Sequence, residues 1–131
     1  MRHFQRVTGL LLILGLGCES PTGPDVAGQW GGAEADLTLA ASGGSIEYPC
    51  ATATIDPAWK LSRDGHWSGT GQHFFGGGPL PAGGQPPHPV SYSGQLTGKT
   101  LTFTVTLLDL HQVLGPYTVE RGRSVALNYC L

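Results

Sequence analysis

The sequence predicts an all-β fold, an antiparallel up-and-down meander of about eight strands that closes into a small barrel. Charged residues are only 12% of the 131, and the 21 glycines and 10 prolines suit short strands and tight turns. The clearest segment is 100–108, where Leu101, Phe103, Val105 and Leu107 alternate with threonines at a period of two. No segment has a helical period of comparable quality, and this length accommodates one domain.

The N-terminal segment, residues 1–17, has the pattern of an export signal. Arg2 and Arg6 precede an apolar run at 10–16 that is too short to serve as a membrane anchor. Cleavage after Gly17 would make Cys18 the first residue of the mature chain. The tail of this segment, L-G-L-G-C, resembles the lipobox of bacterial lipoproteins, although Gly15 stands where that family usually has leucine.

The lipobox resemblance implies that Cys18 carries lipid and anchors the protein in the bacterial cell envelope. Glu19 after the cysteine favours the outer membrane, because it is not the aspartate that marks inner-membrane retention in some of these lipoproteins. Residues 18–25 contain two prolines and are expected to form a tether to a barrel domain at 26–131. The alternative is an ordinary secretory signal with an incidental cysteine.

The remaining two cysteines, Cys50 and Cys130, most simply form one disulfide in an exported chain. A bond that closes such a long loop would stabilise the fold by about 4 kcal/mol. Two unpaired buried thiols are the alternative. Without residues 1–17 the net charge is about −4, so nucleic acid is excluded as the expected partner.

Apolar alternation and turn residues place the individual strands along the domain. We expect strands at 28–30, 35–41, 45–50, 66–75, 90–96, 100–108 and 124–131, with 51–55 continuing the third strand in shifted phase. Trp59 and Leu61 form a short apolar pair, and the pattern is weak from 110 to 115 before Tyr117 and Val119. Residues 76–89 form a long surface loop, since ten of the fourteen are glycine or proline.

Sequential hairpins of this kind leave exposed edges unless the sheet closes on itself, which favours a barrel over a two-layer sandwich, the alternative. The triplet Gly28-Gln29-Trp30 on the first strand resembles the G-x-W of lipocalins and avidins, the calycin-type barrels. That resemblance implies that Trp30 plugs one end of the barrel. It also implies that an arginine of the last strand, Arg121 or Arg123, packs over the indole, and that the loop 76–89 lies at the pocket mouth.

Aromatic residues occur on nearly every strand, so some of them must fill the barrel. If the interior is partly open, the candidate ligand-binding residues are Trp30, Trp59, Trp67, Tyr92 and Phe103. A cavity above about 300 Å³ would favour a small apolar ligand. A filled interior would favour a surface role.

Catalytic and metal-binding patterns are weak. The histidines are scattered and expected to be exposed, with His66 and His73 facing opposite sides of their strand. A metal site from His73 and His88 across the loop is the less favoured interpretation, so neither a metal nor another cofactor is expected. We therefore expect a non-catalytic cell-envelope binding module with a membrane anchor. The alternative is a periplasmic inhibitor or protein-interaction module that uses its surface.

Overall fold

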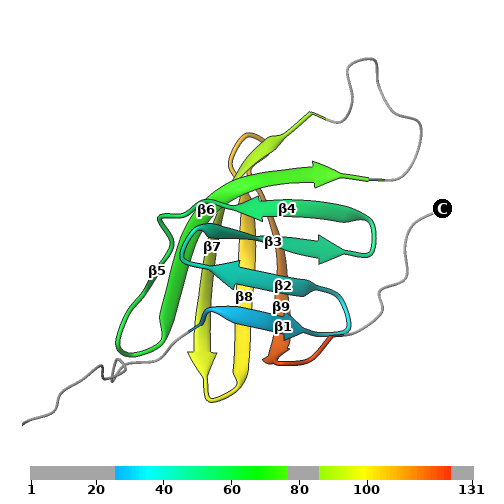
Figure 1. Cartoon of the computed structure of the whole chain (residues 1–131). Helices are drawn as coiled ribbons and strands as arrows, with labels where there is room; N and C mark the ends of the chain where they lie inside the picture. The colour runs from blue at the N-terminus through cyan, green and yellow to red at the C-terminus, as the bar shows by residue number, and fades with distance from the viewer. Residues whose placement is uncertain (1–25, 77–85, 125–131) are drawn as a thin grey trace, which may run out of the picture.

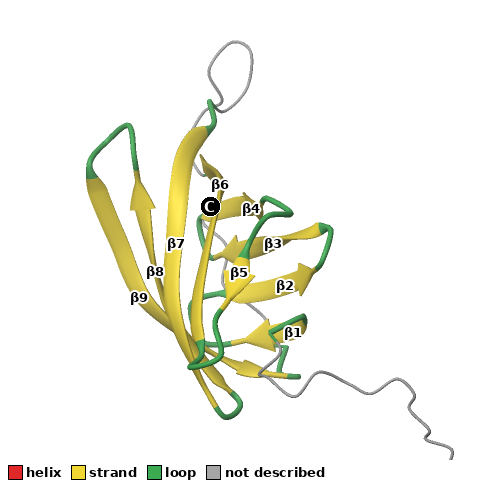
Figure 2. Cartoon of the chain, turned by 90° about the vertical axis from the view of Figure 1, so that its left-hand side faces the viewer, coloured by secondary structure: helices red, strands yellow, loops and turns green. Residues whose placement is uncertain are grey.

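The computed structural model describes residues 26–76 and 86–124, and this part of the chain contains strands and no helix (Figures 1 and 2). Its strands are β1 (Gly28–Gly31), β2 (Asp36–Ala40), β3 (Gly43–Tyr48), β4 (Ala51–Ile55), β5 (Lys60–Leu61), β6 (His66–Phe75), β7 (His88–Thr97), β8 (Thr100–Leu107) and β9 (Gln112–Arg121).

Eight of these strands close into a small antiparallel barrel, and the short β5 is an addition to it (Figure 1). The strand order is β4-β3-β2-β1-β9-β8-β7-β6-β5, and a further pairing of β4 with β6 completes the ring. At the other seam β9 returns to the first strand, with Arg121 opposite Trp30. The predicted up-and-down barrel is confirmed, and its closure removes the exposed edges that a meander would otherwise present.

Strand β8 has the two faces that its sequence predicts. Leu101, Phe103, Val105 and Leu107 are all buried, while the intervening threonines are partly exposed. On the outer face Thr102 and Thr118 of the neighbouring strand lie 3.3 Å apart, within hydrogen-bond distance. The apolar face supplies a large share of the barrel core, to which every other strand except β5 contributes at least one buried side chain.

Strand β6 changes partner along its length, and glycine makes that change possible. Its first half pairs with β5, and its second half pairs with β4 from Gly71 to Phe75. A Cβ atom on Gly71 would lie 1.8 Å from the carbonyl oxygen of Thr54, so no other residue fits without moving the backbone. The close approach bends β6 around the barrel.

Strand β9 begins at Gln112, within the stretch at 110–115 where the sequence pattern is weak. Its register with β8 shifts between Phe103 and Val105, because an extra residue is inserted at Gly115-Pro116. Gly115 has a φ of 97°, which suits this bulge. The bulge puts Leu114 and Tyr117, three residues apart, on the same side of the strand and so hides the period of two. The strand predicted at 124–131 lies outside the described residues apart from Ser124, which is not in a strand.

Two element boundaries differ from the sequence prediction. Residues 51–55 do not continue β3 in shifted phase but return antiparallel to it, after a tight turn at Pro49-Cys50. Proline has no amide hydrogen to donate to a continuing ladder, which favours the turn. The second difference is that His88 and Pro89, predicted as the end of the loop at 76–89, are the first two residues of β7.

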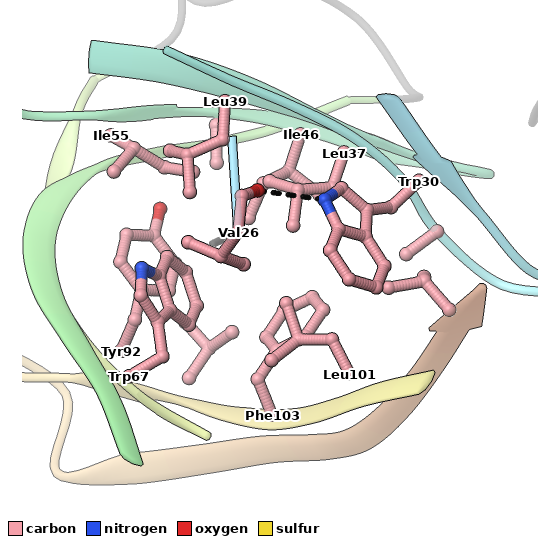
Figure 3. Close-up of a cluster of buried hydrophobic side chains, with 14 of the residues drawn as sticks. Val26, Trp30, Leu37, Leu39, Ile46, Ile55, Trp67, Tyr92, Leu101 and Phe103 are labelled. Carbon is pink, nitrogen blue, oxygen red and sulfur yellow. Dashed lines mark hydrogen bonds between the residues drawn. The ribbon is translucent and has the colours of Figure 1, made fainter. Parts of the chain in front are cut away.

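Trp30 is buried near the end of the barrel where β7 turns into β8, as the calycin resemblance implies, and this end is called the sealed end. Figure 3 shows its indole beside Val26 and Leu37. The indole is fully buried, and its Nε1 donates a hydrogen bond to the carbonyl oxygen of Val26 at 2.8 Å. Arg121, and not Arg123, packs over the ring with its guanidinium carbon 4.4 Å from the centroid, and it also donates to the carbonyl of Ala27 at 2.9 Å. The chain thus enters the barrel across this end and seals it.

Candidate functional site

The opposite end of the barrel, where β1–β2, β3–β4 and β8–β9 turn, contains an open pocket of about 340 Å³. Described residues from four segments line it: Glu34, Tyr48, Pro49, Cys50, Ala51, His73, Phe75, Leu114 and Tyr117. The volume lies at the lower end of the range for small-molecule sites, about 300–1,000 Å³. A shallower depression of about 410 Å³ lies beside β5, lined in part by Lys60 and Ser68. No residue that lines this depression has a buried side-chain nitrogen or oxygen without a hydrogen-bond partner, whereas Tyr48 and His73 of the open-end pocket do.

His73 is the most unusual group in the open-end pocket. It is the buried polar residue of the described core, with 1% of its surface exposed, and it points inward from β6 in phase with Trp67. Neither Nδ1 nor Nε2 has a hydrogen-bond partner within the described structure. A neutral imidazole has one N–H donor and one acceptor nitrogen, so this ring offers both to anything that enters.

Tyr48 places a second unpaired polar atom in the same pocket. The side chain points inward from β3 with 5% exposure, and its hydroxyl lacks a partner within the described residues. Its ring centroid lies 5.4 Å from that of His73 and 5.1 Å from that of Tyr117. Buried polar groups without partners are rare in folded proteins, and two on one pocket wall indicate a site that a ligand or water completes.

Aromatic rings continue on both sides of this pair. Phe75 lies 4.7 Å from His73 and 5.2 Å from His88, measured between centroids, and His88 Nδ1 is 2.8 Å from an Asp109 carboxylate oxygen. On the other side Tyr117 packs at 5.5 Å against Phe103 of the core. The pocket wall is therefore an aromatic surface that is anchored in the barrel interior.

Burial keeps the ionisable side chains of this wall neutral. It lowers the pKa of His73 below its ordinary 6.5, and the charge of His88 lowers it further. Burial also raises the pKa of Tyr48, with smaller contributions from Tyr92 and Tyr117. The pKa of Tyr117 is raised first by burial and then by the Glu34 carboxylate. At neutral pH the pocket thus presents phenol and imidazole, with one carboxylate at its rim.

The five aromatic residues proposed from sequence lie elsewhere. Trp30, Trp67, Tyr92 and Phe103 are packed in the core, where Trp67 stacks on Tyr92 at 5.7 Å and meets Phe103 edge-on at 5.8 Å (Figure 3). Trp59 lies outside the barrel strands and donates its Nε1–H to the carbonyl of Ala40 at 2.7 Å. Tyr92 alone of the five borders a hollow, the depression beside β5. None of the five lines the open-end pocket, because four of them fill the middle of the barrel and the pocket lies beyond them.

Sequence reasoning missed His73, which was expected to be exposed. The available signal was its phase, since Trp67, Gly69, Gly71 and His73 occupy alternate positions and share the inner face of β6. The prediction that His66 faces the other way is confirmed, because His66 is exposed.

His73 and His88 are cross-strand partners of β6 and β7, but within residues 26–76 and 86–124 no cluster of three potential ligands could hold a metal ion. The same residues include no helix long and apolar enough to cross a membrane. Cys18, Cys130 and residues 77–85 of the predicted mouth loop lie outside the described part of the chain. The lipidation and the Cys50–Cys130 disulfide therefore stay predictions.

Comparison of the chain with protein-family models, with curated proteins and with solved structures finds no match. The likeness to calycin-type barrels therefore rests on the closed eight-stranded architecture, on Gly28-Gln29-Trp30 and on the packing of Arg121 over Trp30.

Proposed function

We propose that this protein is a non-catalytic binding module that holds a small, largely apolar ligand in the open-end pocket. The observation that carries the proposal is a hollow of about 340 Å³ into which Tyr48 and His73 direct buried polar atoms without partners. Apolar walls with a few convergent polar groups are the usual make-up of ligand sites. The sealed end at Trp30 complements this arrangement, because a ligand would enter and leave through one mouth only.

The uncharged fluorescent probe N-phenyl-1-naphthylamine tests this proposal, since its emission rises when it enters an apolar site. We expect saturable binding to the purified protein, and loss of that binding in Ala51→Trp, which places an indole in the pocket. Thr52→Trp is the matched control, because the next side chain of β4 is exposed on the outer face. Equal binding by both variants, or no binding by the parent protein, would contradict the proposal.

We also propose that the domain is tethered to the cell envelope through lipidated Cys18, with the outer membrane as the expected location. The described chain begins at Val26 at the sealed end, so a tether at 18–25 would leave the pocket mouth directed away from the bilayer. Intact-mass spectrometry of the native protein would show the cleavage site, any acyl chains and the predicted Cys50–Cys130 bond. If Cys18→Ser still partitions with membranes, the lipid anchor is wrong.

A protein-interaction role is the second candidate, and one surface feature favours it. The β8–β9 turn exposes Leu108 and Leu110, and the start of β9 exposes Val113, with 48%, 47% and 62% of their surfaces accessible. Exposed apolar side chains of this size at one end of a hairpin are typical of a contact surface. A photo-crosslinking residue at Leu110 in intact cells should then give a discrete adduct, whereas one at exposed Arg63 should not. Equal labelling at both positions would remove this alternative.

A further inference from the structure

Four aromatic rings meet at the open-end pocket: Tyr48, His73, Phe75 and Tyr117. Three pairs of neighbouring rings connect them: Tyr48–Tyr117, Tyr48–His73 and His73–Phe75. In these pairs the centroids are 4.7 to 5.4 Å apart, and the two ring planes are inclined to each other by 48° to 70°. Rings arranged in this way form a curved wall and not a flat stack. The π-faces of such a wall attract a cation that comes within about 6 Å of a ring centroid.

The charges around the pocket also favour a cation. Glu34 lies on its lining, and its negative charge contributes to the raised pKa of the Tyr117 phenol. Neither lysine nor arginine occurs among the described lining residues. An anionic ligand would therefore lose its hydration without gaining a countercharge, whereas a cation would gain one.

The titratable groups that face the pocket from neighbouring strands do not offset this preference. His73 from β6 stays neutral at physiological pH, since burial and His88 lower its pKa. His88 from β7 is directed to Asp109 by their 2.8 Å contact. Tyr48 and Tyr117, from β3 and β9, have raised pKa values and remain uncharged phenols. Glu34 is thus the unpaired charge among the described residues that line the site.

The unpaired buried atoms complete the pattern. The Tyr48 hydroxyl oxygen and the acceptor nitrogen of neutral His73 can each accept a hydrogen bond. A primary ammonium has three N–H donors, enough for both atoms and for a carboxylate such as Glu34. A quaternary ammonium has none and would rely on the rings alone.

We propose that the open-end pocket binds a small organic ammonium cation, a primary amine protonated at neutral pH and attached to an aryl or short alkyl body. This inference rests on the proposed ligand-binding function and names the ligand class. The ammonium lies between Glu34, Tyr48 and His73, and the apolar body packs on Phe75, Leu114 and Tyr117. The pocket volume of about 340 Å³ is near the lower end of the range for small-molecule sites, so the apolar body is small.

Calorimetric titration of the purified protein at pH 7.5 with three probes of one shape tests the inference. The probes are 2-phenylethylammonium, the neutral 2-phenylethanol and the anionic 3-phenylpropionate. We expect the ammonium to bind at least about tenfold more tightly than the alcohol, and the carboxylate to bind most weakly. Trimethylation of the amine should cost affinity, because it removes the donors to Tyr48 and His73.

Glu34→Gln should weaken binding of the ammonium about fivefold or more and leave the alcohol unchanged. Glu47→Gln is the matched control, since it makes the same change of net charge on β3 outside the pocket lining and should have no such effect. Ammonium and alcohol of equal affinity, or tighter binding of the carboxylate, would overturn the cation inference and leave the binding function standing. Failure of all three probes and of N-phenyl-1-naphthylamine would overturn both.

Discussion

Replacing His73 with phenylalanine should make the protein more stable and at the same time remove a polar group from its proposed site. The imidazole is buried in an aromatic surround, yet neither ring nitrogen has a partner within the described residues. Phenylalanine keeps the ring contacts with Tyr48 and Phe75, which lie 5.4 and 4.7 Å away, and has no polar atom to desolvate. The adjoining cavity leaves room for the slightly larger ring.

The expected gain follows from the cost of leaving a polar group without a partner. Each unsatisfied buried donor or acceptor costs about 1–3 kcal/mol. Because the pocket is open and water can relieve part of this cost, we expect His73→Phe to raise the free energy of unfolding by about 1–3 kcal/mol in total. In a domain of about 100 residues this corresponds to roughly 4–8 °C in Tm for each kcal/mol.

Urea denaturation followed by circular dichroism measures the effect. His66→Phe is the control, because His66 is exposed on the same strand and its replacement should change stability by less than about 0.5 kcal/mol. A His73→Phe variant less stable than the parent by 1 kcal/mol or more would refute the reasoning, since it would mean that the imidazole nitrogens make stabilising contacts.

The difference between parent and variant should also depend on pH. The folded-state pKa of His73 is lowered, first by burial and then by His88, below the value of 6.5 expected in the unfolded chain. Between these values the unfolded chain binds a proton that the folded protein does not, so unfolding becomes easier as the pH falls. The contribution of neutral His73 to the free energy of unfolding is therefore fully present above pH 6.5, and it is lost as the pH falls from there through the folded-state pKa. The advantage of His73→Phe should therefore be larger at pH 5 than at pH 7.5, and an unchanged difference would contradict the burial of a neutral ring.

Two further variants test the sealed end and the bend of the barrel. Arg121→Ala removes the cation–π contact with Trp30 and the hydrogen bond to Ala27, and should lower the free energy of unfolding by about 2–3 kcal/mol. Arg123→Ala removes only an exposed ion pair with Glu120 and should cost less than about 1 kcal/mol, so equal losses in urea titrations would contradict the role of Arg121. Gly71→Ala should destabilise by about 3 kcal/mol or prevent folding, since its Cβ would collide with a strand carbonyl. Gly69→Ala meets a side-chain carbon at 3.2 Å and should be tolerated better in the same assay.

The sequence was sufficient for the barrel because most strands keep a strict alternation. β8 shows this most clearly, with every second residue buried, and the strand predicted at 90–96 buries Tyr92 and Leu96 on one face of β7. β9 escaped prediction because the bulge at Gly115-Pro116 breaks the alternation, and a bulge depends on the register with a neighbouring strand. The return of β4 was missed for a related reason, since Pro49 is compatible with both a bulge and a turn.

The site was harder to predict than the fold. Aromatic content pointed to Trp30, Trp67 and Phe103, but which rings fill a barrel and which border a hollow depends on their height along its axis, and that height follows from the strand stagger. The packing of Arg121 over Trp30 was implied by the calycin resemblance and is confirmed. His73 looks like an ordinary polar residue in the sequence, and only the closure of β6 onto β4 makes it buried.

The central claim is that the barrel is sealed at Trp30 and hollow at the end bordered by Tyr48, His73 and Tyr117. Nuclear Overhauser contacts between bound N-phenyl-1-naphthylamine and the ring protons of the protein test it most directly. We predict contacts to Tyr48, His73 and Tyr117 and none to Trp30. Contacts confined to Trp59 or to the exposed leucines of the β8–β9 turn would place the probe outside the barrel and contradict the claim.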